Sequence, residues 1–219
     1  MNPRCVKCGQ GVEKLYIQYS PGNIRLLKCS NCKSVADEYI ECEVMILIID
    51  LILHKPPAYR HLLFNLLRDK VQNFDALLFK LSIIFLALDA YKLWILNGIS
   101  VEQSIMIMGL KTFGCALLGN VVFFCVLLVL PRRFLTFVDD FSGYRDVLLV
   151  VIVSSYLKLY MLSMLVWELP ASVVYIIDLF VMSSNMVALR AITESPFRRC
   201  FGLCFGVHAL KFFVNWLLK

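Results

Sequence analysis

Two pairs of cysteines near the N-terminus constrain this chain more than any other feature. Cys5 and Cys8 are separated by two residues, and so are Cys29 and Cys32. Each C-x-x-C segment turns sharply enough for both sulfurs to reach one ion, and four thiolates complete a tetrahedral zinc site. A redox dithiol and a pair of disulfides are the competing interpretations. We expect structural zinc, with no coordination position left open for catalysis.

The segment between the two cysteine pairs has the composition of a β-hairpin. Val12 to Tyr19 is rich in aromatic and β-branched residues, Ser20 to Asn23 is a turn sequence, and Ile24 to Lys28 leads back to the second pair. A knuckle, a hairpin and a second knuckle form a zinc ribbon, which we assign to residues 1–43. A domain this small builds little core, so metal binding would supply its folding energy.

The remainder of the chain is too apolar for a soluble domain. Of its 219 residues 60% are hydrophobic, against about 45–50% in soluble domains. Five apolar segments of membrane-spanning length follow Leu77, and we predict an all-α polytopic bundle over residues 77–219. The predicted spans are 77–97, 105–130, 147–169, 172–192 and 200–218. Four or three spans stay open as alternatives, because the third and fourth segments could form a re-entrant hairpin around Pro170 and the fifth is short. The net charge of +6 is modest and does not indicate nucleic-acid binding.

Residues 44–76 connect the ribbon to the bundle. Val44 to Leu53 is apolar but too short to span a membrane, and Pro56 and Pro57 follow it. We expect a short helix there, packed under the ribbon or lying in the interface. Residues 58–74 have helical apolar spacing with basic residues on other faces, which fits a helix in the headgroup region or one packed on the ribbon. The polar stretch 1–43 predicts no cleavable signal peptide.

The basic residues alternate between successive loops. They precede the first span, return between the second and third, and return again between the fourth and fifth, while the other two loops lack Lys and Arg. Positively charged loops face the cytosol, so this pattern predicts a cytosolic N-terminus. The cysteines would then lie in a reducing compartment, where zinc binding is favoured over disulfides.

Ionisable residues inside the predicted spans are functional candidates because burying a charge in lipid is costly. Asp89 and Lys92 are spaced to neutralise each other on one helix face. Asp178 and Lys158 have no partner visible in the sequence. Other such residues lie near span ends and can extend to the interface: Lys80, Glu168 and Lys211.

Two further patterns carry less information. His54 and His61 lie near Asp50, but the proline pair interrupts the helix between them, so we do not expect a catalytic cluster. Small residues allow helices to approach closely, and we expect them to pack within the molecule: Gly109, Gly114, Gly119, Gly202 and Gly206.

The N-terminal part resembles the Arv family of endoplasmic-reticulum lipid-homeostasis proteins. The resemblance covers residues 1–66, the Arv homology region, and the membrane part is similar only in general character. It rests on these elements in this order: Cys5-x-x-Cys8, Leu15-Tyr16, Tyr19-Ser20, Gly22 to Leu26, Cys29-x-x-Cys32, Ala36 to Tyr39, Glu41, Ile49 to Leu53, and Ala58 to Asn65.

The resemblance implies a multi-pass protein of the endoplasmic-reticulum membrane that is not an enzyme. It implies a role in moving sterol out of that membrane, in sphingolipid balance and in the supply of glycosylphosphatidylinositol (GPI) precursors. The implied partners are membrane lipids, above all sterol, and proteins of lipid or GPI synthesis. We expect lipid binding or gating at these residues: Asp50, Tyr59, Arg60, His61, Asp89 and Lys92.

Two other functions remain open. In the first, the chain is an adaptor whose ribbon docks a lipid- or GPI-synthesis complex without transporting lipid. In the second, it is an enzyme that transfers an acyl or head group with intramembrane Asp or His. The spans carry no convergent His/Asp pair visible in the sequence, which argues against the enzyme.

Overall fold

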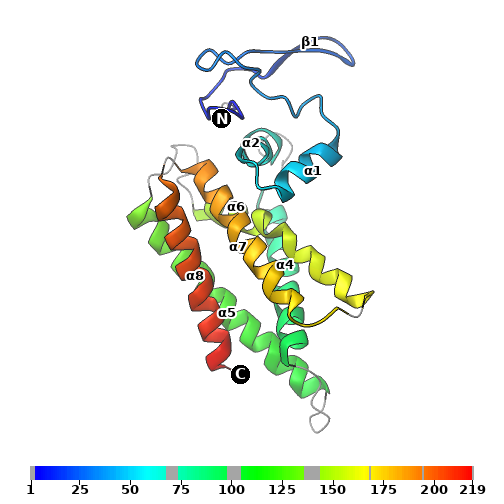
Figure 1. Cartoon of the computed structure of the whole chain (residues 1–219), viewed down its shortest axis with the longest axis vertical. Coiled ribbons are helices and arrows are strands. Elements are labelled where there is room, and N and C mark those ends of the chain that lie inside the picture. The colour runs from blue at the N-terminus through cyan, green and yellow to red at the C-terminus, as the bar shows by residue number, and fades with distance from the viewer. Residues whose placement is uncertain are drawn as a thin grey trace.

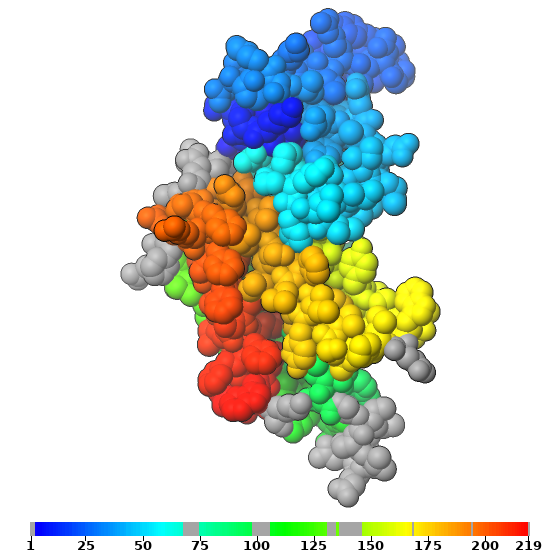
Figure 2. All heavy atoms as spheres, in the orientation of Figure 1, coloured from blue at the N-terminus to red at the C-terminus, as the bar shows by residue number. Residues whose placement is uncertain are grey.

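The structure is a computed structural model that describes residues 3–67, 74–97, 105–135, 144–167, 169–193 and 195–218. It has a small head, a layer of short helices and a bundle of long helices (Figure 1). The head is stacked on one end of the bundle, as the blue and cyan atoms of Figure 2 show.

The head contains the predicted hairpin. Strands β1 (Tyr16–Ser20) and β2 (Asn23–Leu26) are antiparallel, with Tyr16 opposite Leu26. Gly22 makes the turn with a φ of 85°, a conformation that glycine adopts without strain. Every residue of β1 is exposed, so the hairpin contributes almost no core.

Three short helices form the layer beneath the head: α1 (Val44–Ile52), α2 (Pro56–Arg60) and the π-helix η1 (His61–Leu66). Helix α1 confirms the predicted short helix. It buries Leu47 and Leu51 and leaves Val44, Met45 and Ile49 exposed, so it presents an apolar face outward as interfacial helices do.

The predicted helix over residues 58–74 begins as α2 and continues as η1. Its buried side chains pack against the head and the bundle. Of the three basic residues that suggested an interfacial position, Arg60 contacts the head, and Arg68 and Lys70 lie outside the described residues.

The bundle consists of α4 (Phe74–Asn97), α5 (Ile105–Phe134), α6 (Tyr144–Ser154), the 3₁₀-helix η3 (Ser155–Leu165), α7 (Val173–Ile192) and α8 (Phe197–Leu217). Helix α6 and η3 follow one another as a single rod. The rods run alternately away from the head and back toward it, and the C-terminus lies at the far end (Figure 1).

Four rods are long and apolar enough to cross a membrane: Met106–Leu130, Asp146–Leu165, Val173–Ile192 and Phe197–Leu217. They confirm four of the predicted spans and make this a membrane protein. Helix α4 covers the first predicted span, but it carries Asp75, Lys80, Asp89 and Lys92. The fifth crossing therefore remains a prediction.

The glycines divide into two groups. A Cβ added at Gly119 would clash with Oδ1 of Asn215, so α5 and α8 approach closely there. A Cβ added at Gly114, Gly202 or Gly206 would meet nothing within 4 Å. The expectation of packing within the molecule is therefore wrong for Gly114 of α5 and for the G-x-x-x-G pair of α8, because these positions face open space.

Candidate functional site

The four cysteines of the two knuckles converge on one point. All four Sγ atoms lie within 4.8 Å of one another. The distances are 3.7 Å from Cys5 to Cys32 and 3.6 Å from Cys8 to Cys29. Ligands at about 2.3 Å from a central ion are separated by about 3.8 Å in a tetrahedron, whereas disulfide sulfurs are about 2.05 Å apart. The donor set and its spacing fit zinc.

The two knuckles share one backbone hydrogen bond. In each, the amide four residues after the first cysteine donates to the carbonyl of that cysteine. The amide of Gly9 donates to the carbonyl of Cys5, and the amide of Lys33 donates to that of Cys29. Gly9 and Lys33 both have positive φ, 81° and 60°. This shared turn aims two pairs of thiols at one ion.

The thiols differ in acidity before metal binds. Hydrogen bonds from the backbone amides of Cys32 and Asn31 lower the pKa of Cys29 to about 7. Burial raises the pKa of Cys5 to about 12. Zinc binds the thiolate form, so the second knuckle offers its ligand more readily at neutral pH.

A buried carboxylate attaches the head to the helices beneath it. Asp37 is 0% exposed and accepts hydrogen bonds from Nδ1 of His61 at 2.7 Å and Nδ2 of Asn65 at 2.6 Å. Asn65 also bonds both the backbone amide and the carbonyl of Arg4, each at 3.0 Å. Sequence reasoning missed Asp37 and Asn65 as site residues. The available signal was their place in the motif segments Ala36 to Tyr39 and Ala58 to Asn65, whereas their burial is visible only in the fold.

The predicted lipid-gating residues of the head gather at this junction. Arg60 donates to the carbonyls of Val6 and Lys7, inside the first knuckle. The hydroxyl of Tyr59 bonds Oγ of Ser184 on α7 at 2.7 Å. Asp50 accepts from the hydroxyl of Tyr39 and pairs with Lys55. Together with His61, these side chains hold head, helix layer and bundle together.

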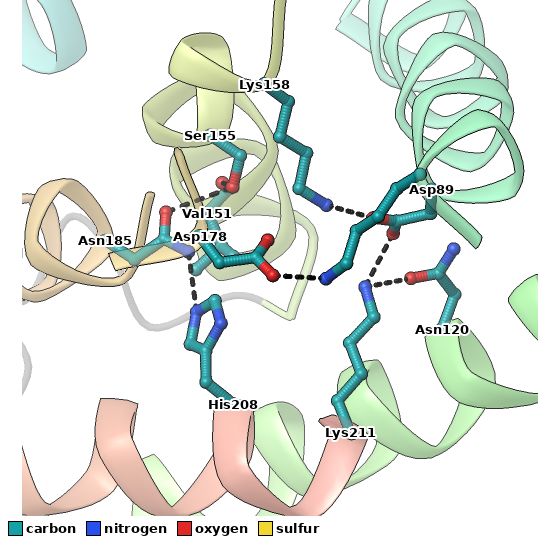
Figure 3. A network of polar contacts seen from close by, with 10 residues as sticks. Asp89, Asn120, Val151, Ser155, Lys158, Asp178, Asn185, His208 and Lys211 are labelled. Atoms are coloured by element: carbon teal, nitrogen blue, oxygen red, sulfur yellow. Dashed lines mark hydrogen bonds and ion pairs between the residues drawn. The ribbon is translucent and has the colours of Figure 1, made fainter. Parts of the chain in front are cut away.

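A second polar cluster lies within the bundle (Figure 3). Asp89 of α4 is 3% exposed and accepts from Nζ of Lys158 on η3 at 2.7 Å and from Nζ of Lys211 on α8 at 2.5 Å. Lys211 also donates to Oδ1 of Asn120 on α5 at 2.6 Å. One carboxylate therefore connects three rods directly and a fourth through Lys211.

The partners within the bundle differ from those predicted. Lys92 pairs with Asp178 of α7 at 2.5 Å, so Asp89 and Lys92 do not neutralise each other. Both belong to interhelical ion pairs because they face different neighbouring helices. Lys211 does not extend to the interface as predicted, since it is 6% exposed and faces Asp89. Of the other two residues expected there, Lys80 is exposed, and Glu168 lies outside the described residues.

An amide extends the cluster toward the head. Oδ1 of Asn185 on α7 accepts from Ser154 at 2.6 Å and from Ser155 at 3.1 Å. Its Nδ2 lies 3.1 Å from Nε2 of His208. Because Nδ2 is a donor, Nε2 accepts and His208 is neutral with its proton on Nδ1. Asn185 is next to Ser184, so two successive residues of α7 contact the head junction and the polar cluster.

A cavity of 320 Å³ opens from this cluster toward the outside of the bundle. Its polar floor is formed by the two aspartates, the three paired lysines and His208. Aromatic side chains dominate its walls: Phe85, Phe123, Tyr175, Phe205 and Phe212. Asp89 and Lys92 line it, whereas Asp50, Tyr59, Arg60 and His61 do not.

A second cavity of 260 Å³ continues toward the far end of the bundle. It shares Lys92, Tyr175 and Phe212 with the first. This second cavity has polar residues of its own, among them Asn97, Lys111 and Asn215. The first cavity, whose aromatic walls adjoin the charged cluster, is the one that suits a molecule with a large apolar body and a small polar group.

Comparison with known proteins finds relatives of this sequence. Residues 4–189 match the model of the Arv1-like family. The chain is 42% identical over 222 residues to Protein ARV 2 of Arabidopsis thaliana, covering 96% of this chain and 92% of that protein. It is also 42% identical to Protein ARV 1 of the same plant, covering 99% and 89%. Protein arv1 of Schizosaccharomyces pombe is 55% identical over 64 residues, 28% of this chain and 24% of that protein. No solved structure matches the chain.

Proposed function

This chain belongs to the Arv1-like family, and on that premise we propose that it mediates sterol transport from the endoplasmic reticulum as part of membrane lipid homeostasis. The same role would extend to sphingolipids and GPI precursors. The observation that carries the proposal is the cavity above Asp89, which opens sideways from a membrane-spanning bundle and has aromatic walls and a polar floor. A sterol would place its rings against the walls and its hydroxyl on the floor.

In this proposal the head lies on the cytosolic side of the endoplasmic-reticulum membrane. Arg190, Arg198 and Arg199 lie at the ends of α7 and α8 nearest the head (Figure 1). The stretch 169–172, at the opposite ends of the rods, has no Lys or Arg. This distribution follows the positive-inside rule.

The proposed function needs no catalysis. The cysteine centre uses four protein ligands, which leaves no open position for a substrate. When zinc is bound it supplies folding energy to the head. Arg60 then holds α2 against the first knuckle, and the hydrogen bond between Tyr59 and Ser184 holds α2 against α7.

We expect a photo-crosslinkable sterol to label the purified, zinc-loaded protein saturably and to be displaced by unlabelled sterol. The labelled residues should lie in the walls of the cavity. Phe212→Trp, which adds bulk to one wall, should weaken labelling at least about tenfold, since small volume changes in apolar pockets have effects of that size. Quantitative mass spectrometry of the labelled peptides measures both quantities.

Phe201→Trp is the matched control, because Phe201 is an exposed residue of the same helix that does not line the cavity. It should label like the parent protein. Diffuse labelling without competition, or equal loss in both variants, would exclude the cavity as a sterol site.

A second candidate function is an adaptor for a lipid- or GPI-synthesis complex. The observation that favours it is the hairpin of the head, which exposes Ile17 (40%) and Tyr19 (64%) away from the bundle. A defined complex should then co-purify with the parent protein and be lost in Tyr19→Ser, with the zinc content unchanged. Retention of that complex by Tyr19→Ser would contradict docking through the hairpin.

A further inference from the structure

A separate cleft of 240 Å³ lies at the junction of head and bundle. It lies between the first cysteine knuckle, the start of α2 and the last turns of α7. Its lining consists of Lys7, Pro56, Pro57, Arg60, Val187, Arg190 and Ala191. None of these residues lines the intramembrane cavities.

The polar lining of this cleft is entirely cationic. Lys7 and Arg190 are exposed, and Arg60 is half-buried. The lining contains no carboxylate, and in the described part of the chain none of the three forms an ion pair with Asp or Glu. Burial lowers the pKa of Arg60, the thiols of Cys8 and Cys5 oppose that shift, and the positive charge of Arg190 adds to it. An anion in the cleft would offset both the burial and the repulsion from Arg190.

The guanidinium of Arg60 is held in place and keeps donors available. Its Nη1 donates to the carbonyls of Val6 at 2.9 Å and Lys7 at 2.8 Å. Among the described residues, Nε and Nη2 have no hydrogen-bond acceptor. A guanidinium fixed in this way offers paired N–H groups in the geometry that phosphate oxygens accept.

The position of the cleft indicates which anion reaches it. Arg190 lies in the last turn of α7, at the end of the candidate span Val173–Ile192. The end of a span lies at the level of the lipid headgroups. Basic residues there attract anionic lipids of the cytosolic leaflet.

We infer that Lys7, Arg60 and Arg190 form a binding site for a phosphoryl group, and that an anionic phospholipid headgroup supplies it. The acyl chains would lie in the bilayer beside α7, and the phosphate would bridge the head and α7. The same chemistry would accept a free phosphate, so the experiment must separate the two sources.

The test titrates the zinc-loaded full-length protein in neutral detergent with three probes: dioctanoyl phosphatidic acid, dioctanoyl phosphatidylcholine and inorganic phosphate. Binding is followed by thermophoresis and by the shift in melting temperature. We expect phosphatidic acid to bind in preference to the other two, with an affinity that falls as salt rises. Lys7→Gln with Arg190→Gln should weaken this binding at least about tenfold.

Lys14→Gln with Arg25→Gln is the control, because it makes the same charge change at exposed head positions outside the cleft. It should bind like the parent protein. If inorganic phosphate binds as tightly as phosphatidic acid, the site stands but the lipid source is wrong. If no anion binds, or if both double variants lose affinity equally, the site is overturned. The sterol experiment above decides the intramembrane cavity independently.

Discussion

We expect removal of zinc from the full-length protein to unfold its head and to leave its helical bundle largely intact. The head has an exposed hairpin and little core, so the metal would supply most of its folding energy, about 10–16 kcal/mol in comparable zinc-bound peptides. We expect one zinc per chain, and trypsin cleavage at Lys14, Arg25 and Lys28 only after a chelator is added. Cys29→Ser should reproduce the chelated state without chelator.

Cys42→Ser is the matched control within the head, because Cys42 lies outside the cluster of four sulfurs. It should retain zinc and resist trypsin. Metal analysis and limited proteolysis measure the outcome, and far-ultraviolet circular dichroism reports on the bundle. Full trypsin resistance of Cys29→Ser without bound metal would show that the head folds without zinc.

The second large effect is expected at Asp89. Asp89→Leu leaves Lys158 and Lys211 buried without their counter-ion. Breaking a buried ion pair from one side costs about 3–5 kcal/mol. For a chain of this length that corresponds to a fall in melting temperature of roughly 10 °C, measured in detergent by a thermal shift assay. Lys80→Gln, at an exposed position of the same helix, should change it little.

A triple variant separates electrostatics from packing. Asp89→Leu combined with Lys158→Met and Lys211→Met removes every charge of the three-residue cluster, so most of the lost stability should return. Sterol labelling should stay below that of the parent protein, because three of the six polar residues of the cavity floor are then missing. A triple variant that melts below Asp89→Leu would show that the defect comes from packing.

The ribbon and most of the helical architecture follow from the sequence for physical reasons. Two C-x-x-C pairs around a turn at Gly22 leave few arrangements other than a four-sulfur cluster, and apolar segments of span length form helices because lipid cannot satisfy backbone polar groups. The partners of buried charges, in contrast, do not follow from the sequence. Asp89 pairs with residues 69 and 122 positions away, and only the arrangement of the rods determines those contacts.

The roles of the residues in the Arv-like motif also could not be predicted from the sequence alone. Tyr59, Arg60 and His61 were identified from the sequence, but as lipid-gating residues. In the structure they contact Ser184, the first knuckle and Asp37. The motif identifies these residues as important. Whether they bind a ligand or join two layers of the structure depends on which surfaces meet in the fold.

The 3₁₀ geometry of η3 has a consequence for the length of its rod. Its eleven residues advance about 22 Å, against about 16 Å for an α-helix. Three residues per turn also align Ser155, Lys158 and Met161, all buried, in one straight row. An α-helix would rotate each member of that row by about 60° from the last. The chain therefore crosses the bundle with fewer residues than an α-helix would need. Rewinding this segment to an α-helix would shorten the rod and turn Lys158 away from Asp89.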